Sequence, residues 1–193
     1  TLVNIENITG SSANDTISGD SLANTLKGGA GDDLLSAGAG NVFDYIDGGT
    51  DTNTVDYTDA HNASNVRVNL SGLAQTLNVT TTNNMTGATS AMTDTLVNIQ
   101  NVNTGGGNDT IWGSATKNVI DSGSGNDTIF INAGNDTINA GSGADIIYGG
   151  TDVEVINAQD GNDSIVASAG ADVIDGGNNI DLVDYSVSST GIN

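Results

Sequence analysis

The chain has 193 residues, with 24 Asp and Glu against 3 Lys and Arg, which gives a formal net charge of −21. Such a polyanion has no basic surface for nucleic acid and is repelled by anionic membranes, so we expect neither partner. The absence of Cys excludes disulfides and thiolate metal sites, and no apolar run approaches the ~18 residues that a membrane span needs. Low hydrophobicity with high net charge is typical of disorder unless cations neutralise the acid.

Fourteen nine-residue units make up most of the sequence. Five run over residues 10–56, the fourth of them lengthened by two residues, and nine follow one another without a gap over residues 104–184. The eighth position is aliphatic in every unit, and the sixth is Asp in ten units, Glu in one and Asn in three. One aliphatic residue between polar neighbours predicts a short, half-buried strand. Glycine, frequent at the first, second and fourth positions, permits turns with positive φ between these strands.

The consensus G-G-x-G-x-D-x-U-x, in which U is aliphatic, resembles the calcium-binding nonapeptide of bacterial RTX proteins. In that family each unit is a turn followed by a short strand, and two units form one coil of a right-handed parallel β-roll. The resemblance extends over all fourteen units. It implies an all-β fold, namely a right-handed parallel β-roll (a β-solenoid) with two nonapeptides per coil.

A longer repeat is superimposed on the nonapeptides. A lead-in motif at residues 1–8 (TLVNIENI) recurs at 95–102 (TLVNIQNV), and an exit motif at 48–58 (GGTDTNTVDYT) recurs at 176–186 (GGNNIDLVDYS). We therefore expect two roll modules, joined by a Thr/Asn-rich β segment with a strand near residues 66–70, as an excerpt of a longer tandem array. The expected boundaries are a first module at 1–58 with a leading strand at 1–9, the joining segment at 59–94, a second module at 95–186 with a leading strand at 95–103, and the start of a further segment at 187–193.

Units on the same side of a roll are two nonapeptides apart, so their sixth-position side chains stack into columns. One column of the second module, called the long column below, contains Asp109, Asp127, Asp145, Asp163 and Asp181. The opposite column contains Asn118, Asp136, Glu154 and Asp172, and the first module gives Asp15, Asp33 and Asn53 on one side and Asn24 and Asp44 on the other. Carboxylates ~4.8 Å apart repel by roughly 0.9 kcal/mol in water and about 3.5 kcal/mol at an effective dielectric constant of 20. A metal-free roll is therefore strained, and we expect cation binding and folding to be one event.

Ca²⁺ takes six to eight oxygen ligands, and the RTX resemblance implies that several Ca²⁺ ions lie between successive turns, mainly along the long column. The implied carboxylate ligands are Asp15, Asp33, Asp44, Asp109, Asp127, Asp136, Asp145, Asp163, Asp172 and Asp181. The implied backbone carbonyl ligands are those of Thr104, Gly105, Gly106, Gly107, Ser122, Gly123, Ser124, Gly125, Ala140, Gly141, Ser142, Gly143, Ala158, Gln159, Asp160 and Gly161. The alternative is that these Asp residues only favour turns.

The opposite column departs from the family pattern. Asn118 has no charge, Glu154 is one methylene longer than Asp, and Asp152 replaces a turn glycine. We therefore expect weak or absent ions on that side, apart from the surroundings of Asp136 and Asp172.

The ninth positions beside the long column hold Trp112, Phe130 and Tyr148. They predict an outward-facing apolar ladder, which marks a contact surface. The joining segment, a neighbouring module or a second copy of the chain would cover it, and carbohydrate binding is the alternative. The single histidine, His61, has no recognisable catalytic partner, and no catalytic residue is predicted.

The sequence thus predicts a calcium-binding structural repeat region, without enzymatic activity, of a secreted or cell-surface bacterial protein. A surface layer, an adhesin or a filament is the expected setting, and the resemblance implies type I secretion with folding on Ca²⁺ outside the cell. Two alternatives stay open. One is the non-catalytic tail of a secreted enzyme such as an epimerase, protease or lipase, and the other is a roll that itself binds glycan or ice.

Overall fold

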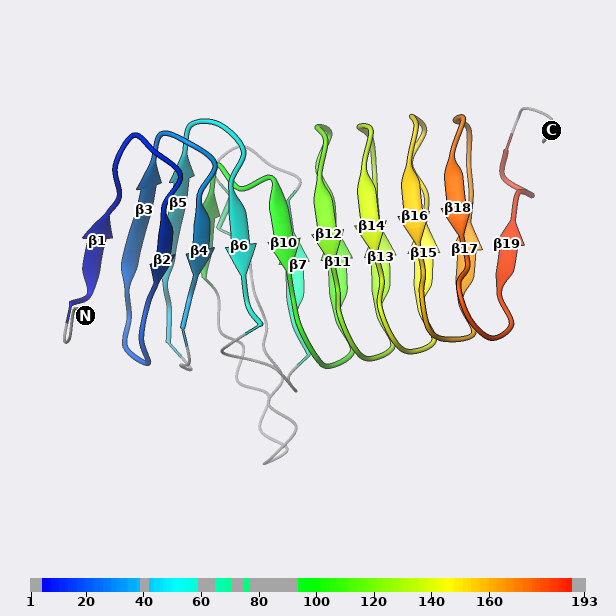
Figure 1. Ribbon diagram of the computed structural model, residues 1–193, viewed down its shortest axis with the longest axis horizontal. Coiled ribbons are helices and arrows are strands. Elements are labelled where there is room, and N and C mark those ends of the chain that lie inside the picture. Colours follow the sequence, from blue (N-terminus) through cyan, green and yellow to red (C-terminus); the bar gives the residue numbers. More distant parts are fainter. Residues whose placement is uncertain (1–4, 39–41, 59–64, 71–74, 77–93, 189–193) are drawn as a thin grey trace.

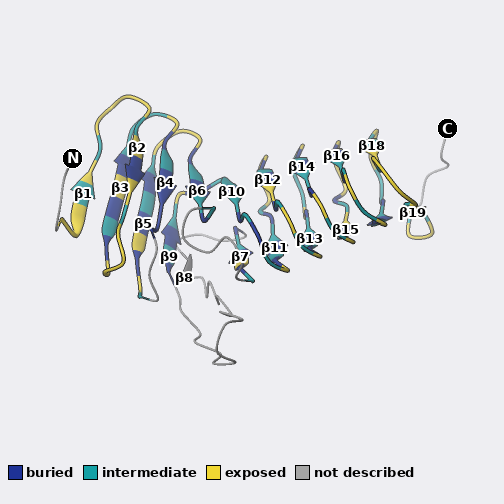
Figure 2. Ribbon diagram, turned by 60° about the horizontal axis from the view of Figure 1, so that its bottom comes forward, coloured by how far each residue is buried: buried dark blue, intermediate teal, exposed yellow. Residues whose placement is uncertain are grey.

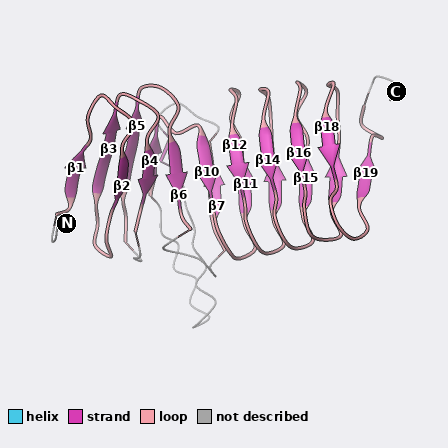
Figure 3. Cartoon of the chain, in the orientation of Figure 1, coloured by secondary structure: helices cyan, strands magenta, loops and turns pink. Residues whose placement is uncertain are grey.

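The computed structural model describes residues 5–38, 42–58, 65–70, 75–76 and 94–188 (Figure 1). These residues form short strands and turns without a helix (Figure 3), so the all-β fold is confirmed for them. No helix in these ranges could cross a membrane. His61, the first four residues of the lead-in motif and most of the joining segment lie outside the described residues.

Nearly every strand is three residues long, as expected for one aliphatic residue between polar neighbours. Residues 5–58 contain β1 (Asn7–Thr9), β2 (Thr16–Ser18), β3 (Thr25–Gly29), β4 (Leu34–Ser36), β5 (Tyr45–Gly49) and β6 (Thr54–Asp56). The joining segment contributes β7 (Arg67–Asn69) and β8 (Gln75–Thr76). The rest contains β9 (Thr95–Val97), β10 (Asn101–Asn103), β11 (Thr110–Trp112), β12 (Val119–Asp121), β13 (Thr128–Phe130), β14 (Thr137–Asn139), β15 (Ile146–Tyr148), β16 (Val155–Asn157), β17 (Ser164–Val166), β18 (Val173–Asp175) and β19 (Leu182–Asp184).

Apart from β8 and β9, consecutive strands do not pair with each other. Within each set of repeats a strand pairs in parallel with the strand two units away, so that Ile111 lies opposite Ile129 and Ile120 opposite Ile138. The strands form one eight-stranded sheet in the order β18-β16-β14-β12-β10-β6-β4-β2, and two sheets on the other side in the orders β1-β3-β5-β9-β8 and β19-β17-β15-β13-β11-β7. Only the β8–β9 pair is antiparallel among the described strands. The result is a β-solenoid, in agreement with the expected parallel β-roll (Figure 1).

The eight-stranded sheet continues from the first set of repeats into the second, because β6 pairs with β10. On the other side, β5 is followed by β9 of the lead-in motif, and β7 of the joining segment pairs with β11. The predicted strand near 66–70 is therefore confirmed, with Val66 and Val68 buried against the core. The module boundaries drawn from the repeats stay a proposal about how the sequence is organised.

A thin core fills the space between the facing sheets. The eighth-position side chains form it as predicted, and Ile111, Ile129 and Ile147 are fully buried. First-position residues also point inward, which the sequence analysis missed because it treated that position as part of the turn. Ile131 and Ala140 are both fully buried there. Burial is continuous along the middle of the solenoid and decreases toward β1 and β19 (Figure 2).

The core predicts unequal effects of the same substitution at the eighth position of two different units. Ile129→Ala removes a fully buried side chain in the middle of the solenoid and should lower the free energy of unfolding by about 2–5 kcal/mol. Ile174→Ala removes a partly buried side chain near the β18 end and should cost clearly less. Urea unfolding of both variants at saturating calcium checks this. Equal losses would contradict the burial gradient.

Candidate metal-binding columns

Each carboxylate of the long column joins two coils. The Oδ1 atom of Asp127 accepts a hydrogen bond from the backbone N–H of Asp109 at 2.7 Å. The same bond recurs from Asp127 to Asp145 at 2.8 Å, from Asp145 to Asp163 at 2.9 Å and from Asp163 to Asp181 at 3.0 Å. The sixth position directly precedes the strand, so its N–H faces the neighbouring coil. A side chain with an oxygen at this position therefore fixes the register between coils.

The second carboxylate oxygen in this column has no partner. Oδ2 of Asp109, Asp127, Asp145 and Asp163 is buried without a hydrogen bond, and these side chains are only 1–2% exposed. Burying an ionised oxygen without a hydrogen bond or a counter-charge is strongly unfavourable. A row of such atoms along one edge marks a place that requires a cation or a proton.

The turns on this edge stack by their backbones. Their third residues form a ladder of parallel bridges from Gly106 through Ser124, Ser142 and Asp160 to Asn178. The carbonyl of Gly105 accepts the N–H of Ser124 at 2.7 Å, and the pattern repeats along the edge. Because a carbonyl oxygen has two lone pairs, each of these acceptors retains one for a further ligand.

Glycine is favoured at the second turn position by both conformation and space, although Gln159 occupies the same position on this edge with a φ of 76°. Gly123 has a φ of 92°, which L side chains rarely adopt. A Cβ atom there would also overlap the carbonyl oxygen of Gly105 in the preceding turn. The carbonyl oxygens along this edge therefore point from one turn toward the next.

A first-position glycine shows how the oxygens converge. A Cβ atom on Gly28 would touch both Oδ2 of Asp33 and the carbonyl oxygen of Gly48, and a Cβ on Gly10 would touch Oδ2 of Asp15 and the carbonyl of Gly28. The unpartnered Oδ2 of Asp33 and the carbonyl oxygen of Gly48 thus lie close together beside Gly28, whereas Oδ2 of Asp15 accepts hydrogen bonds from the backbone N–H and the hydroxyl of Ser11. Both donors are hard oxygens, the type that Ca²⁺ prefers.

Among the described residues, no three His, Cys, Asp or Glu side chains converge on one point. The carboxylates follow one another along the solenoid axis instead. A cation beside Asp127 would therefore need backbone carbonyls for most of its ligands, as the RTX resemblance implies. The donors present fit Ca²⁺ better than Zn²⁺, which binds nitrogen or sulfur in most protein sites.

The opposite column is built partly from amides. Asn118 donates its Nδ2 hydrogen to the carbonyl of Gln100 at 2.6 Å, and its backbone N–H bonds Oδ1 of Asp136 at 2.7 Å. Glu154 differs, because it is fully buried and neither of its carboxylate oxygens has a partner. The expected weakness of ions on this side, which was inferred from Asn118, Glu154 and Asp152, stays a prediction.

The structure assigns Asp15 and Asp33 to the side of the opposite column. The N–H of Asp33 bonds Oδ1 of Asn53 at 3.1 Å, and the N–H of Asn53 bonds Oε1 of Gln100 at 2.8 Å, so this column continues into Asn118. The repeat alignment suggests instead that Asp15 and Asp109 occupy equivalent sides. The five strands β2 to β6 and the two lead-in strands β9 and β10 together make an odd number of half-coils, which accounts for the exchange.

Two sixth-position residues escaped the sequence analysis. Asp94 accepts the N–H of Asp44 at 3.0 Å through Oδ1, and its Oδ2 accepts the hydroxyl of Tyr57 at 3.1 Å. Gln100 occupies the same position before β10. Both precede an alternating x-U-x strand but lack a glycine-rich turn. A search for the strand half of the unit alone would have found them.

Burial raises the pKa of these acids. Desolvation raises the pKa of Asp127 and of Asp145 to about 7, and that of Asp109 to about 6. The pKa of Glu154 rises to about 8, through burial first and then through the neighbouring Asp172. Without a cation, the folded chain therefore holds protons on acids that the unfolded chain would release.

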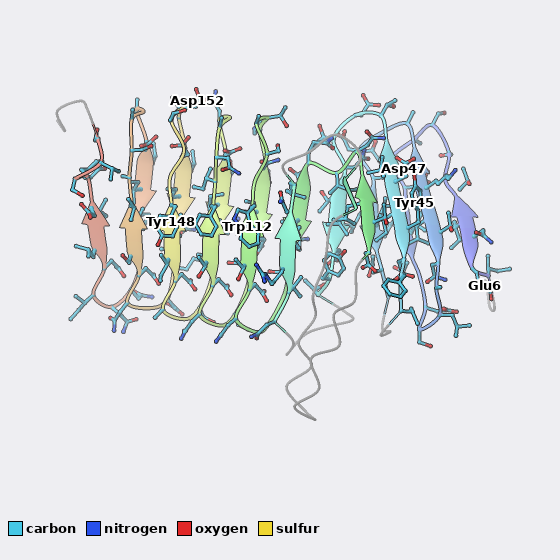
Figure 4. All side chains as sticks on the ribbon, turned by 180° about the vertical axis from the view of Figure 1, so that it is seen from behind. Glu6, Tyr45, Asp47, Trp112, Tyr148 and Asp152 are labelled. Atoms are coloured by element: carbon cyan, nitrogen blue, oxygen red, sulfur yellow. The ribbon has the colours of Figure 1, made fainter. Side chains whose placement is uncertain are left out.

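The aromatic ladder forms as predicted on the outer face beside the long column. The rings of Trp112 and Phe130 stack at 5.5 Å between centroids, and those of Phe130 and Tyr148 at 4.8 Å, with interplanar angles of 5° and 3°. Figure 4 shows Trp112 and Tyr148 in one row on this face. Arg67 of β7 lies over the Trp112 ring at 5.3 Å, so the joining segment covers one end of the ladder.

Comparison with known families agrees with this geometry. The family model of the RTX calcium-binding nonapeptide repeat (4 copies) matches residues 5–21, 9–43, 19–55, 100–129, 132–153 and 148–183, together more than half of the chain. The chain belongs to the RTX calcium-binding repeat family. No curated protein matches it. RTX repeats bind calcium, so the acidic columns are the candidate calcium sites of this chain.

The raised pKa values predict opposite pH effects with and without calcium. In EDTA, Asp127 and Asp145 have folded pKa values of about 7 against 3.8 for an ordinary Asp. Their stabilisation of the ion-free fold is therefore complete below the lower value and lost as the pH rises through the higher one. Circular dichroism in EDTA should thus show β-structure increasing as the pH falls from about 8 to about 5.

With calcium present, acidification should instead raise the calcium concentration at the folding midpoint, because protons compete for the same oxygens. A β signal in EDTA that falls on acidification over this range would contradict the burial of these carboxylates.

Proposed function

We propose that this chain is a calcium-dependent structural region of a secreted or cell-surface bacterial protein, and that it folds when it meets calcium outside the cell. The observation that carries the proposal is the row of buried, unpartnered Oδ2 atoms at Asp109, Asp127, Asp145 and Asp163. In a chain with a net charge of −21, burying such atoms without cations makes the folded state unfavourable.

The proposed ions lie between successive coils of the long column. Each would contact the free oxygen of one sixth-position Asp and carbonyl oxygens of the adjoining turns, such as those of Gly107 and Gly125. Binding would replace the repulsion between neighbouring carboxylates with attraction to a shared cation. Because the ligands come together only in the folded coil, the binding free energy acts as folding free energy.

The amino-acid composition is compatible with export of the unfolded chain. The chain has neither Cys nor Pro, so folding outside the cell requires no disulfide formation and no prolyl isomerisation. Repeat units that contact only their neighbours also let folding begin at one coil and extend to the next. A rigid, acidic spacer in a surface layer, an adhesin or a filament is the role that this construction serves best.

The geometry of the aromatic ladder favours a protein contact rather than a sugar-binding platform. Its rings stack face to face, so Phe130 has both faces covered by Trp112 and Tyr148. A sugar-binding platform presents ring faces to the ligand, whereas this ladder presents ring edges. We therefore favour a neighbouring module or copy at Trp112, Phe130 and Tyr148.

A calcium titration of purified chain tests the proposal. Adding Ca²⁺ to chain in EDTA should produce a cooperative gain of β-structure by far-UV circular dichroism, and Mg²⁺ at the same concentration should not. The double variant Asp127→Asn with Asp145→Asn removes two of the buried charges. It should reduce the cooperativity and raise the calcium requirement.

Asp121→Asn is the matched control, because Asp121 lies on a strand but is exposed on the outer face. It removes the same charge per substitution and should leave the calcium midpoint nearly unchanged. An equal shift for the control and the column variants would indicate a general charge effect. That result would refute the column as the binding site.

A further inference from the structure

The row of turns before the eight-stranded sheet is interrupted at the junction between the two sets of repeats. The units before β6 and β12 have six-residue turns at 48–53 and 113–118, but only residues 98–100 connect β9 to β10. Because β10 lies between β6 and β12 in the sheet, one short connection separates two full turns. Figure 1 shows the chain entering β10 lower in the view than the turns on either side.

A cavity of about 460 Å³, called the junction notch below, lies at this interruption. Its volume is within the range of about 300–1,000 Å³ that is typical of small-molecule sites. The residues that line it come from both full turns and from the short connection between them. They include Asp51 and Thr52 on the β6 side, Thr116 and Lys117 on the β12 side, and Gln100 and Asn101 between these walls.

Asp51 presents a carboxylate at one wall from a turn position at which glycine is common. It stands at the fourth position of its unit and has a φ of 71°, in the left-handed region, where its counterpart Gly31 has a φ of 107°. Oδ2 of Asp51 accepts the N–H of Gly31 at 3.1 Å and the hydroxyl of Thr50 at 3.0 Å. No hydrogen bond within the described residues uses Oδ1, so an oriented carboxylate keeps one oxygen for a ligand.

Lys117 presents the opposite charge at the other wall. It is one of only three basic residues in the chain and stands at the fifth position of its unit. In the next turn on this edge that position is Asn135, whose Oδ1 accepts the N–H of Val153 at 3.3 Å. A lysine cannot accept such a bond, and no ion pair engages its ammonium group within the part of the chain that the structure describes. Its charge acts on Asp136, where it opposes the burial that raises the pKa of that acid to about 6.

The two amide side chains between the walls supply hydrogen-bond donors. Oε1 of Gln100 accepts the backbone N–H of Asn53 at 2.8 Å. Oδ1 of Asn101 likewise accepts the backbone N–H of Val119 at 2.8 Å. Among the described residues, the amino group of Gln100 makes no hydrogen bond, and that of Asn101 makes only a long one, to Oγ1 of Thr54 at 3.4 Å. The notch therefore combines amide donors with one charge of each sign.

We propose that the junction notch binds a free α-amino acid in its zwitterionic form. The ammonium group of the ligand lies against Asp51, and its carboxylate lies against Lys117 and the amide donors. A metal ion fits less well because Lys117 repels it, and an anion is opposed by the net charge of −21 of the chain. A ligand with one charge of each sign and no net charge satisfies both walls. This inference depends on the structure of the junction and not on the proposed function.

The separation of the walls selects a single amino acid over a longer peptide. β6 and β12 are two strand spacings apart, ~9.6 Å, because β10 lies between them. The ammonium and carboxylate groups of one amino acid, with a hydrogen bond at each end, span about 9 Å. Each further residue of an extended peptide adds about 3.5 Å. A zwitterionic dipeptide therefore exceeds the spacing between the walls.

An NMR titration of the isotope-labelled chain in calcium, with its β-structure verified by circular dichroism, tests the site. The probe is L-alanine, and the matched probes L-alaninamide and N-acetyl-L-alanine each lack one of its two charges. L-Alanine should shift the backbone amide signals of Asp51, Gln100 and Lys117. It should bind about three- to fivefold more tightly than either matched probe, because an ion pair between exposed groups contributes about this factor.

Two variants assign the charges of the ligand to the two walls. Asp51→Asn and Lys117→Gln should each weaken L-alanine binding about three- to fivefold, and Asn also tolerates the positive φ at this position. Asp51→Asn should not weaken binding of N-acetyl-L-alanine, and Lys117→Gln should not weaken binding of L-alaninamide. The controls Asp20→Asn and Lys27→Gln remove the same charges at exposed positions elsewhere and should bind L-alanine like the native chain.

Three results would overturn the proposal. The first is L-alanine binding no tighter than that of the two matched probes. The second is a set of shifted signals that lies away from the junction notch. The third is an equal loss of affinity in the notch variants and the controls, which would indicate a general effect of charge.

Discussion

The two oxygens of one buried carboxylate have different tasks, and the architecture depends on this division. Oδ1 of Asp127 holds the N–H of the coil beside it and thereby sets the rung-to-rung register. Oδ2 of the same side chain is buried with no hydrogen bond. The first bond can be made by an amide, as Asn53 shows in the same position. Only the second atom requires a cation or a proton, so under the proposed function the acid, and not the repeat spacing, would make the roll depend on cations.

The hydrophobic contribution is too thin to replace that partner. Each strand buries about one aliphatic side chain, such as Ile129 or Ile138, and the first-position residues are mostly small. A polypeptide with this much like charge and so narrow a core gains stability from each added coil only if the coil also neutralises its acid. Under the proposed function, calcium would therefore act at several coils of the long column rather than at one anchoring site.

Much of the fold followed from the sequence because the strand signal is local. The aliphatic eighth position and the sixth-position oxygen recur with fixed spacing, so the strands, the parallel pairing and the aromatic ladder were predictable. The junction was not. Asp94 and Gln100 lack glycine-rich turns, and the placement of Asp15 and Asp33 in line with Asn118 depends on how the lead-in strands stack. The inward direction of Ile131 also depends on the packing of whole coils.

The most direct test is a crystal structure of calcium-loaded chain with an anomalous difference map. We predict anomalous peaks between the turns of successive coils, beside Oδ2 of Asp109, Asp127, Asp145 and Asp163, the atoms that have no partner without metal. A calcium-loaded structure with the same fold, whose peaks lie only on exposed acids such as Asp121, would contradict the account.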